Sequence, residues 1–496
     1  MLVIISDLHL TDGTTGSSIA PAAFDIFAQE VRDLIYSASW RADGRYRPIE
    51  HIDVLLLGDV LDVIRSARWA SQTVRPYDGA DHPQLASLVT QITTDILTHN
   101  ESSLAVLRGL TMPGQLLVPP ADSQGRPAAG ASGQGVQVAI HYVVGNHDWF
   151  FHVASNRYDA IRDAIVRQLG LANAPGTPFP HDPAECGPLL DIMRRHRVFA
   201  RHGDIFDPFN FEGDRSASSL GDAIVIELLN RFPAEVLKRL GDDVPAATLS
   251  GLKELDNVRP VLLVPVWLDG LLERTCPLLS MRKQIKGIWD ELVDRFLAVP
   301  FVRARRTAPG SRDLVSGLED VLKFSKHVSI GWATRIVTWL QSLRGANASS
   351  FYPHALAEPD FRSRRAKYVV YGHTHYSECV PLEASHAEGY VLNQMYFNSG
   401  TWRRTLRQTV SAPHEHEFVP IDVMTYLAFF QGDERSGRPY ESWSGNLGVA
   451  PTETPTLRLD AARQPAAESP APLVHEFAPH FSSAPVVRRL VPTRRR

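Results

Sequence analysis

Cysteine is scarce in this sequence, and the three cysteines lie far apart. They are Cys186, Cys276 and Cys379 in a chain of 496 residues. An odd number of scattered thiols argues against a disulfide framework and fits a reducing compartment. Their spacing also differs from that of a zinc ribbon. We therefore expect a cytoplasmic protein without a thiolate metal site.

Long apolar runs and an excess of charge of one sign are also missing. No uninterrupted apolar stretch approaches the roughly 20 residues of a membrane span, so we expect no transmembrane segment. The formal net charge is -4, which gives no global electrostatic case for a nucleic-acid partner. Nothing in the sequence supports a peripheral membrane contact either. With 44% hydrophobic and 21% charged residues, the composition is that of a globular protein longer than one average domain.

Polar residues follow each of five apolar runs that predict buried strands. The first run, 2–5, leads into Asp7 and His9. Four later runs end in the same way: 51–57 before Gly58 and Asp59, 138–144 before Gly145, Asn146, His147 and Asp148, 197–201 before His202, Gly203 and Asp204, and 367–371 before Gly372, His373, Thr374 and His375. Open α/β sheets gather binding residues at the carboxyl ends of neighbouring strands, so these side chains are expected to form one site. Alternate residues of an extended segment point the same way, which would let Asp7 and His9 reach one ion.

In this order, the blocks DLH, GD, GNHD, HGD and GHTH resemble those of the calcineurin-like metallophosphoesterase superfamily. The resemblance covers about the first 210 residues and roughly 360–405, and it leaves out the long segment between His202 and His373. It implies an α/β fold, a four-layer αββα sandwich of two sheets flanked by helices. It also implies hydrolysis of a phosphoester by a bridging hydroxide on a two-metal centre.

The resemblance assigns a role to each of these polar residues. Asp59 would bridge two ions, and His147 would stabilise the transition state and protonate the leaving oxygen. The remaining ligands fall into two sets: Asp7, His9 and His375 for one ion, and Asn146, His202 and His373 for the other. Oxygen and nitrogen ligands without thiolates suit Mn, Fe, Zn or Mg, and we expect Mn to serve best in vitro. The substrate-binding residues stay unassigned.

Other polar residues near the blocks have less specific interpretations. Asp148 is expected to orient the loop that carries the metal site, although an ordinary loop carboxylate fits the sequence nearly as well. Arg403 and Arg404 follow the last predicted turn. One of them could contact phosphate, but we interpret them as a solvated pair.

Apolar periodicity and composition predict three regions. Residues 1–210 and 361–431 form the catalytic domain, in which helices are predicted over 84–110 and 157–170. Apolar residues at helical spacing predict a mostly helical insertion or cap over 211–360, and the polar, Gly-, Pro- and Ala-rich residues 432–496 predict a poorly ordered tail. The apolar stripes of the insertion are interpreted as packing faces. The alternative is a cap that receives a lipid group, which the apolar stretch 261–268 suggests.

The blocks do not identify the substrate, because the superfamily hydrolyses monoesters, diesters and pyrophosphates. The layout partly resembles that of UDP-2,3-diacylglucosamine hydrolases, but that family has Arg where this chain has His147, and the insertion here is far larger than its lid. We therefore expect a phosphoester selected by the cap, with a pyrophosphate hydrolase of a nucleotide-linked lipid as one alternative. A nuclease is a second alternative, but it needs a basic groove with stacking aromatics, and the basic run near the blocks is confined to 362–367. A metal-free scaffold predicts replaced ligands, whereas every expected ligand is present.

Overall fold

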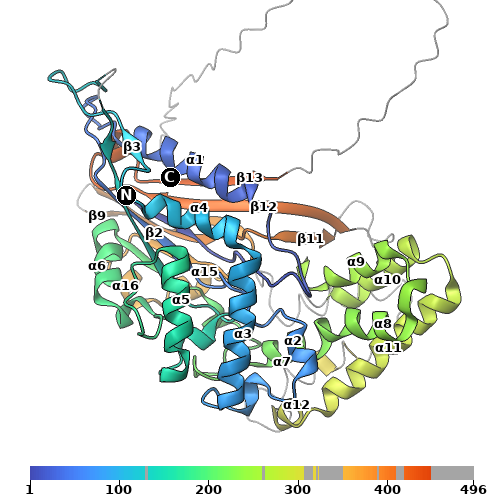
Figure 1. Cartoon of the computed structure of the whole chain (residues 1–496). Coiled ribbons are helices and arrows are strands. Elements are labelled where there is room, and N and C mark those ends of the chain that lie inside the picture. Colours follow the sequence, from blue (N-terminus) through green and yellow to red (C-terminus); the bar gives the residue numbers. More distant parts are fainter. Residues whose placement is uncertain are drawn as a thin grey trace, which may run out of the picture. The chain divides into compact units, whose positions relative to one another are not determined.

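The computed structural model describes residues 1–128, 132–259, 263–305, 317–319, 322, 350–387, 390–408 and 418–447. These residues form a mixed α/β structure with two principal sheets and a small two-stranded one (Figure 1). Among them, no helix combines the length and the apolar character needed to cross a membrane.

The larger sheet contains the first three predicted strands. Its order is β5-β2-β1-β12-β11-β7, with β13 also paired to β12. The strands are β1 (Leu2–Ile5), β2 (His51–Leu57), β5 (Gln137–Val143), β7 (Val258–Arg259), β11 (Arg404–Gln408), β12 (Phe418–Phe429) and β13 (Tyr440–Asn446). Strands β1, β2 and β5 are parallel neighbours, so the residues that follow them meet at one edge of the sheet.

The second sheet contains the other two predicted strands. Its order is β6-β8-β10-β9, and β6, β8 and β10 run parallel. The strands are β6 (Val198–Ala200), β8 (Tyr368–Tyr371), β9 (Ser377–Ala387) and β10 (Tyr390–Ser399), and the separate small pair is β3 (Leu117–Val118) with β4 (Gln134–Gly135). All five strands predicted from the apolar runs are therefore confirmed, each to within one residue at either end.

Strand β1 shows why its residues are apolar on both faces. Val3 and Ile5 belong to one core cluster, together with Phe24 of helix α1 (Ala22–Ala38). Leu2 and Ile4 belong to another cluster, which the strands of both sheets share. A strand buried on both sides reads as a continuous apolar run rather than an alternating one. This is the pattern from which the strand was predicted.

Helices cover the outer faces of both sheets. The far face of the second sheet packs against α15 (Tyr352–Ala355) and α16 (Pro359–Arg362), with Ala355 and Phe361 in the shared cluster. The outer cluster of the larger sheet includes residues of α1, α3 (Pro83–His99), α4 (Glu101–Thr111) and α5 (Asp159–Leu169). Two further helices are α2 (Arg68–Ser71) and α6 (Gly187–His196).

The helix predicted over 84–110 is two helices, so that prediction is wrong in one respect. The break lies at Asn100, whose side-chain amide donates 2.8 Å hydrogen bonds to Ile96 O and to Thr11 O. The bond to Thr11 ties the break to the loop that follows the first block. The helix predicted over 157–170 is confirmed as α5, preceded by a short 3-10 turn.

The insertion is mostly helical, as predicted. Its helices are α7 (Leu220–Ile224), a π-helical turn (Val225–Leu229), α8 (Arg231–Leu240), α9 (Ala246–Lys253), α10 (Val264–Thr275), α11 (Leu279–Ala298) and α12 (Pro300–Arg305). Figure 1 shows α8–α11 grouped beside the sheets. Their apolar faces are buried against one another, and Trp289 packs edge-on to Phe232 with ring centroids 5.1 Å apart. These faces therefore serve packing, and residues 264–268 lie buried within α10. Residues 260–262, 306–316, 320–321 and 323–349 of the insertion lie outside the described residues.

The insertion also contributes to the larger sheet, which the sequence did not predict. Within it, β7 pairs in parallel with β11, and Val258 lies opposite Leu406. The boundary between catalytic domain and insertion is therefore not a structural break, because the insertion supplies an edge strand.

The predicted tail begins too early. Strand β13 pairs antiparallel with β12, and Trp443 stacks on Tyr426 at a centroid distance of 5.4 Å. Residues up to 447 thus belong to the sheet, because aromatic packing outweighs their polar composition. Residues 448–496 lie outside the described part of the chain.

Candidate metal centre

The candidate ligands sit on strained backbone just past the strand ends. Five of them have left-handed φ values between 45° and 67°: Asp7, His9, Asp59, His373 and His375. Such a conformation costs on the order of 1–3 kcal/mol for a residue other than Gly, and it persists where the surrounding structure fixes it. Here the backbone N–H of Asp7 donates to Gly58 O at 3.1 Å, and that of His9 to Asp59 O at 2.9 Å. Strain held in this way is typical of functional sites.

This geometry corrects the reason given for the pairing of Asp7 with His9. The strand ends at Ile5, so the two residues are not extended. Their side chains nevertheless converge, and His9 Nε2 lies 3.9 Å from Asp7 Oδ1. The left-handed turn at each residue produces the convergence that we attributed to alternation along a strand.

The glycines of three blocks are required because ligand side chains occupy the space beside them. A Cβ atom on Gly372 would lie 2.6 Å from Asp7 Oδ2. A Cβ atom on Gly58 or Gly145 would collide with the ring of His202. A side chain at any of these positions would displace a candidate ligand.

The first group of candidate ligands contains Asp7, His9 and His375. All three side chains are buried, and their ligand atoms lie within 4.8 Å of one another. His375 Nε2 lies 3.0 Å from His9 Nε2 and 3.4 Å from Asp7 Oδ1. Two ring nitrogens and a carboxylate oxygen therefore converge on one point.

The second group contains Asp59, His202 and His373, whose ligand atoms also lie within 4.8 Å of one another. The side chain of Asn146 joins this group, with Oδ1 2.9 Å from His373 Nδ1 and 3.3 Å from His202 Nε2. Asp59 Oδ2 lies 3.2 Å from His202 Nε2 and 3.7 Å from His9 Nε2. Asp59 thus stands between the groups, and the structure brings together all seven candidate ligands in the predicted division.

Most of these histidines are oriented by an oxygen atom behind the ring. His9 Nδ1 is 2.9 Å from Asp62 Oδ2, and His202 Nδ1 is 2.9 Å from Leu57 O. His373 Nε2 is 3.0 Å from Asp207 Oδ2. Each oxygen can accept a hydrogen bond from the ring nitrogen that faces it, and the other nitrogen of each ring points into its group, as in metal-binding histidines.

His375 differs from the other three. Its Nδ1 lies 3.0 Å from Nη2 of Arg259, a residue of the insertion. A guanidinium group donates hydrogen bonds and cannot accept them. His375 therefore has a donor behind its ring where the other three histidines have an acceptor.

His147 lies beside the first group and forms a close pair with Asp62. Its Nδ1 is 2.6 Å from Asp62 Oδ1, and its backbone N–H donates to Asp59 Oδ1 at 2.8 Å. Burial alone would lower the pKa of His147, but the carboxylates of Asp62 and Asp59 outweigh burial and raise it to about 10. The ring is therefore a protonated imidazolium at neutral pH. Asp62 holds both His147 and His9, and sequence reasoning missed it.

Asp148 fixes the loops rather than facing the ligands. It is fully buried and accepts hydrogen bonds from the backbone N–H groups of Gly145 and Val60 and from the Tyr142 hydroxyl, at 2.6, 2.9 and 2.6 Å. Burial, with Asp59 nearby, raises its pKa to about 6. This arrangement favours the interpretation of Asp148 as an orienting group over that of an ordinary loop carboxylate.

Two residues near the start of the insertion support the second group. Asp207 holds His373, and Asn210 donates to Asp207 Oδ2 at 3.0 Å. Asn210 Oδ1 also accepts from Asn146 Nδ2 at 3.3 Å, which turns the Asn146 oxygen toward the histidines. Their position directly after the HGD block was the only signal in the sequence that pointed to them.

A buried cluster of charges lies behind the first group. Asp256, from the insertion, pairs with Arg403 at 2.8 Å and with Arg65 at 3.5 Å. Arg403 Nη1 also lies 3.8 Å from Asp62 Oδ2. Arg403 is only 4% exposed, so its interpretation as a solvated residue is wrong. Arg404 pairs instead with Asp422 at 2.8 Å.

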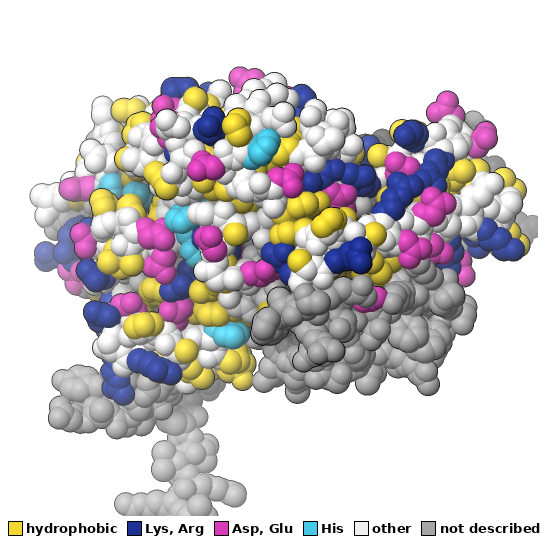
Figure 2. All heavy atoms as spheres, turned by 90° about the horizontal axis from the view of Figure 1, so that it is seen from below, with side chains coloured by type: hydrophobic (Ala, Val, Ile, Leu, Met, Phe, Trp, Pro, Cys, Tyr) yellow, Lys and Arg dark blue, Asp and Glu magenta, His cyan; other side chains and the backbone are white. Residues whose placement is uncertain are grey.

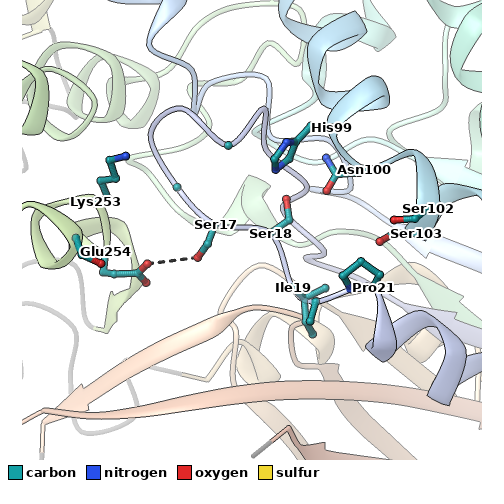
Figure 3. Close-up of a pocket in the computed structure, with 14 residues that line it drawn as sticks. Ser17, Ser18, Ile19, Pro21, His99, Asn100, Ser102, Ser103, Lys253 and Glu254 are labelled. Carbon is teal, nitrogen blue, oxygen red and sulfur yellow. Dashed lines mark hydrogen bonds between the residues drawn. The ribbon is translucent and has the colours of Figure 1, made fainter. Parts of the chain in front are cut away.

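A pocket of about 440 Å³ lies between the loop after the first block and the insertion (Figure 3). Its lining is rich in hydroxyl groups and includes Ser17, Ser102, His99 and Lys253. Ser17 donates to Glu254 Oε1 at 3.3 Å across it, as the dashed line shows. No candidate ligand lines this pocket.

No family model and no curated protein matches the chain. The case for a function therefore rests on the geometry of the centre.

Proposed function

We propose that this chain is a binuclear metallophosphoesterase, which hydrolyses a phosphoester at two divalent ions held by the two groups. One observation carries the proposal. Asp59 Oδ2 stands between the groups, 3.7 Å from His9 Nε2 and 3.2 Å from His202 Nε2. Two like-charged ions about 3.5–4 Å apart need a shared anionic ligand, and this carboxylate is placed to be one.

The donor atoms fit the proposed ions. They are carboxylate, amide and imidazole atoms, which suit Mn, Fe, Zn or Mg. Orienting oxygens behind three histidines provide the support that bound metals require. Two such ions would supply a hydroxide near neutral pH and would neutralise charge on the phosphoryl oxygens.

The protein's own groups would supply the proton. His147 is protonated, and its Nδ1–H donates a hydrogen bond to Asp62. Its Nε2 proton is therefore the one that we assign to the leaving oxygen, in the role of a general acid.

The arrangement of the sheets supports the proposed fold as well. The two sheets share a core cluster, and helices pack on the outer face of each. We propose on this basis the four-layer αββα arrangement that the resemblance implies.

The competing functions have less support. On the face in Figure 2, the Lys and Arg side chains of the described residues are interspersed with Asp and Glu, unlike the basic groove that a nuclease needs. The apolar stretch that suggested a lipid-binding cap is buried in α10 where it is described. A metal-free scaffold would not need the strained ligand backbone.

The direct test compares a chromogenic phosphodiester with the matching monoester, with Mn²⁺ added and with chelator as the control. We expect hydrolysis that the chelator abolishes and that Mn²⁺ restores. Chelator-resistant turnover would contradict the two-metal proposal. The preferred ester would then separate a phosphatase from a diesterase.

A further inference from the structure

Arg259 brings the insertion into the metal centre. It ends β7, whose pairing with β11 anchors this part of the insertion to the larger sheet. Its Nη1 donates to the carbonyls of Val258 and Asp256, which folds the side chain back over its own turn. Its Nη2 reaches His375 Nδ1 at 3.0 Å. A positive charge from the insertion thus touches a candidate ligand.

Arg259 belongs to a cluster of buried guanidinium groups. Arg65 and Arg403 pair with Asp256 at 3.5 and 2.8 Å, and Arg259 also acts on the charge of Asp256. Asp62 lies 3.8 Å from Arg403, but it is also shared between His9 and His147. Buried guanidinium groups are costly unless they are paired and hydrogen-bonded, so an anion that accepts their hydrogen bonds would stabilise the cluster.

Hydrogen-bond donors without acceptors also indicate that the cluster favours an anion. Arg65 is 1% exposed and Arg403 is 4% exposed. Within the described part of the chain, Nε and Nη1 of both side chains have no hydrogen-bond acceptor. Buried donors without acceptors are rare in proteins, and an anionic ligand nearby would reduce their cost.

The contact between Arg259 and His375 adds a third argument. A histidine that binds an ion through Nε2 keeps its hydrogen on Nδ1. Arg259 has no acceptor to offer that hydrogen. An ion on His375 therefore excludes the present contact, and it would free Arg259 Nη2 for another acceptor.

We propose that Arg259 is a substrate-binding residue, whose guanidinium binds a non-bridging phosphoryl oxygen, and that Asp256 positions it. This inference rests on the proposed function and adds the insertion to the catalytic machinery. A guanidinium fork matches the geometry of a phosphoryl group, and its charge-assisted hydrogen bonds are the strong ones. The insertion would then contribute to binding every phosphoester, not only to selecting among them.

The test uses the full-length protein loaded with Mn²⁺ and measures the binding of inorganic phosphate by calorimetry. Arg259→Gln should weaken phosphate binding about 10- to 100-fold, the effect of losing a hydrogen bond to a charged group. Arg259→Lys keeps the positive charge but loses the forked guanidinium. Its affinity for phosphate should therefore lie between those of the wild type and Arg259→Gln. Arg239→Gln is the matched control, because Arg239 lies in the same insertion but pairs on the surface with Glu235 and Glu291.

Bound Mn²⁺ is counted in each variant, because a purely structural role predicts another result. If Arg259 only holds His375, then Arg259→Gln loses Mn²⁺ and phosphate together, which overturns the proposal. Full Mn²⁺ binding with unchanged phosphate affinity overturns it too. Thermal denaturation identifies a variant that fails to fold. If Arg259→Gln does not fold, the Mn²⁺ content and phosphate affinity of Arg259→Lys test the proposal instead.

Hydrolysis assays separate this inference from the proposed function. If the wild type hydrolyses esters and Arg259→Gln does so equally well, then the inference fails and the function stands. If the wild type hydrolyses nothing but binds phosphate through Arg259, then the function fails and the anion site stands.

Discussion

The two ligand groups differ in what lies behind their histidines. In the second group, His202 and His373 are each held by an oxygen, Leu57 O or Asp207 Oδ2. In the first group, His9 is held by Asp62, but His375 faces Arg259. The second group is therefore preorganised for an ion alone. The first group is joined through Asp62 to His147 and through Arg259 to the insertion, so the proposed function predicts that ion binding and substrate binding are coupled there.

The largest effect should come from removing the residue that the two groups share. Asp59→Asn keeps the shape of the side chain but removes the charge that holds two ions together. We expect kcat/KM to fall by at least about 10³-fold, more than about 4 kcal/mol of transition-state stabilisation. Near-wild-type turnover, with the circular dichroism spectrum unchanged, would show that the groups do not act as one centre.

A smaller loss should follow from breaking the link between the first group and His147. Asp62→Asn would leave both His147 and His9 without their carboxylate partner, so kcat is measured with saturating Mn²⁺. Because general acid catalysis contributes about 10²–10⁴-fold, we expect kcat to fall about 10²-fold. An ester with a good leaving group, which needs no proton, should lose less. Equal losses on good and poor leaving groups would argue against His147 as the acid.

The corresponding change in the second group should affect the ions rather than the chemistry. Asp207→Asn removes the carboxylate behind His373. Loss of such a partner typically lowers metal affinity 10- to 100-fold. We expect excess Mn²⁺ to restore kcat in this variant, whereas it should not restore Asp62→Asn. If excess Mn²⁺ restored kcat in both variants, the two groups would not differ in this way.

Acidification should also lower the stability of the fold, through the buried His196. Its Nδ1 donates to Ile192 O at 2.9 Å, and its Nε2 accepts from Gln431 at 3.0 Å. Burial lowers its pKa to about 4, below the ordinary value near 6.5. The unfolded chain therefore binds a proton first as pH falls through this window, and the free energy of unfolding decreases.

Between pH 6.5 and pH 5 this coupling should cost the wild type on the order of 2 kcal/mol. Chemical denaturation at the two pH values measures it, with His196→Gln as the comparison. The variant should lose less stability than the wild type on acidification. The same loss in both proteins would show that His196 does not carry the effect.

The smallest effect should come from the pocket between the loop after the first block and the insertion. Ser102→Trp would fill the space that Figure 3 shows, while Ser87→Trp, at an exposed position of α3, is the control. We expect kcat/KM for bulky esters to drop a few-fold, an effect on the order of 1 kcal/mol. Turnover of the small chromogenic ester should not change. An equal drop for both esters would mean that the pocket does not receive the substrate.

The strands and the polar residues that follow them were accessible from the sequence for a physical reason, whereas the family resemblance singled out the seven candidate ligands among those residues. A central strand buried on both faces reads as an apolar run, and a polar residue directly after it marks the sheet edge. Glycine before Asp59, Asn146 and His373 reflects the space that ligand side chains occupy. These signals are local, so they survive in the sequence alone.

The supporting residues left no such signal. Asp256 and Arg259 lie far along the chain in a short turn and a two-residue strand, and only the pairing with β11 brings them to the centre. Arg403 was misjudged because its burial depends on Asp256, which arrives from the insertion. Asp62 lies only three residues after Asp59, and its role depends on the placement of His147.

The central claim is that Asp59 joins the two groups into one binuclear centre. Electron paramagnetic resonance of the Mn²⁺-loaded protein tests it most directly, together with a count of bound ions. The account predicts two Mn²⁺ per chain and a spin-coupled spectrum, with coupling lost in Asp59→Asn. A single ion per chain, or two ions that are uncoupled in the wild type, would contradict it.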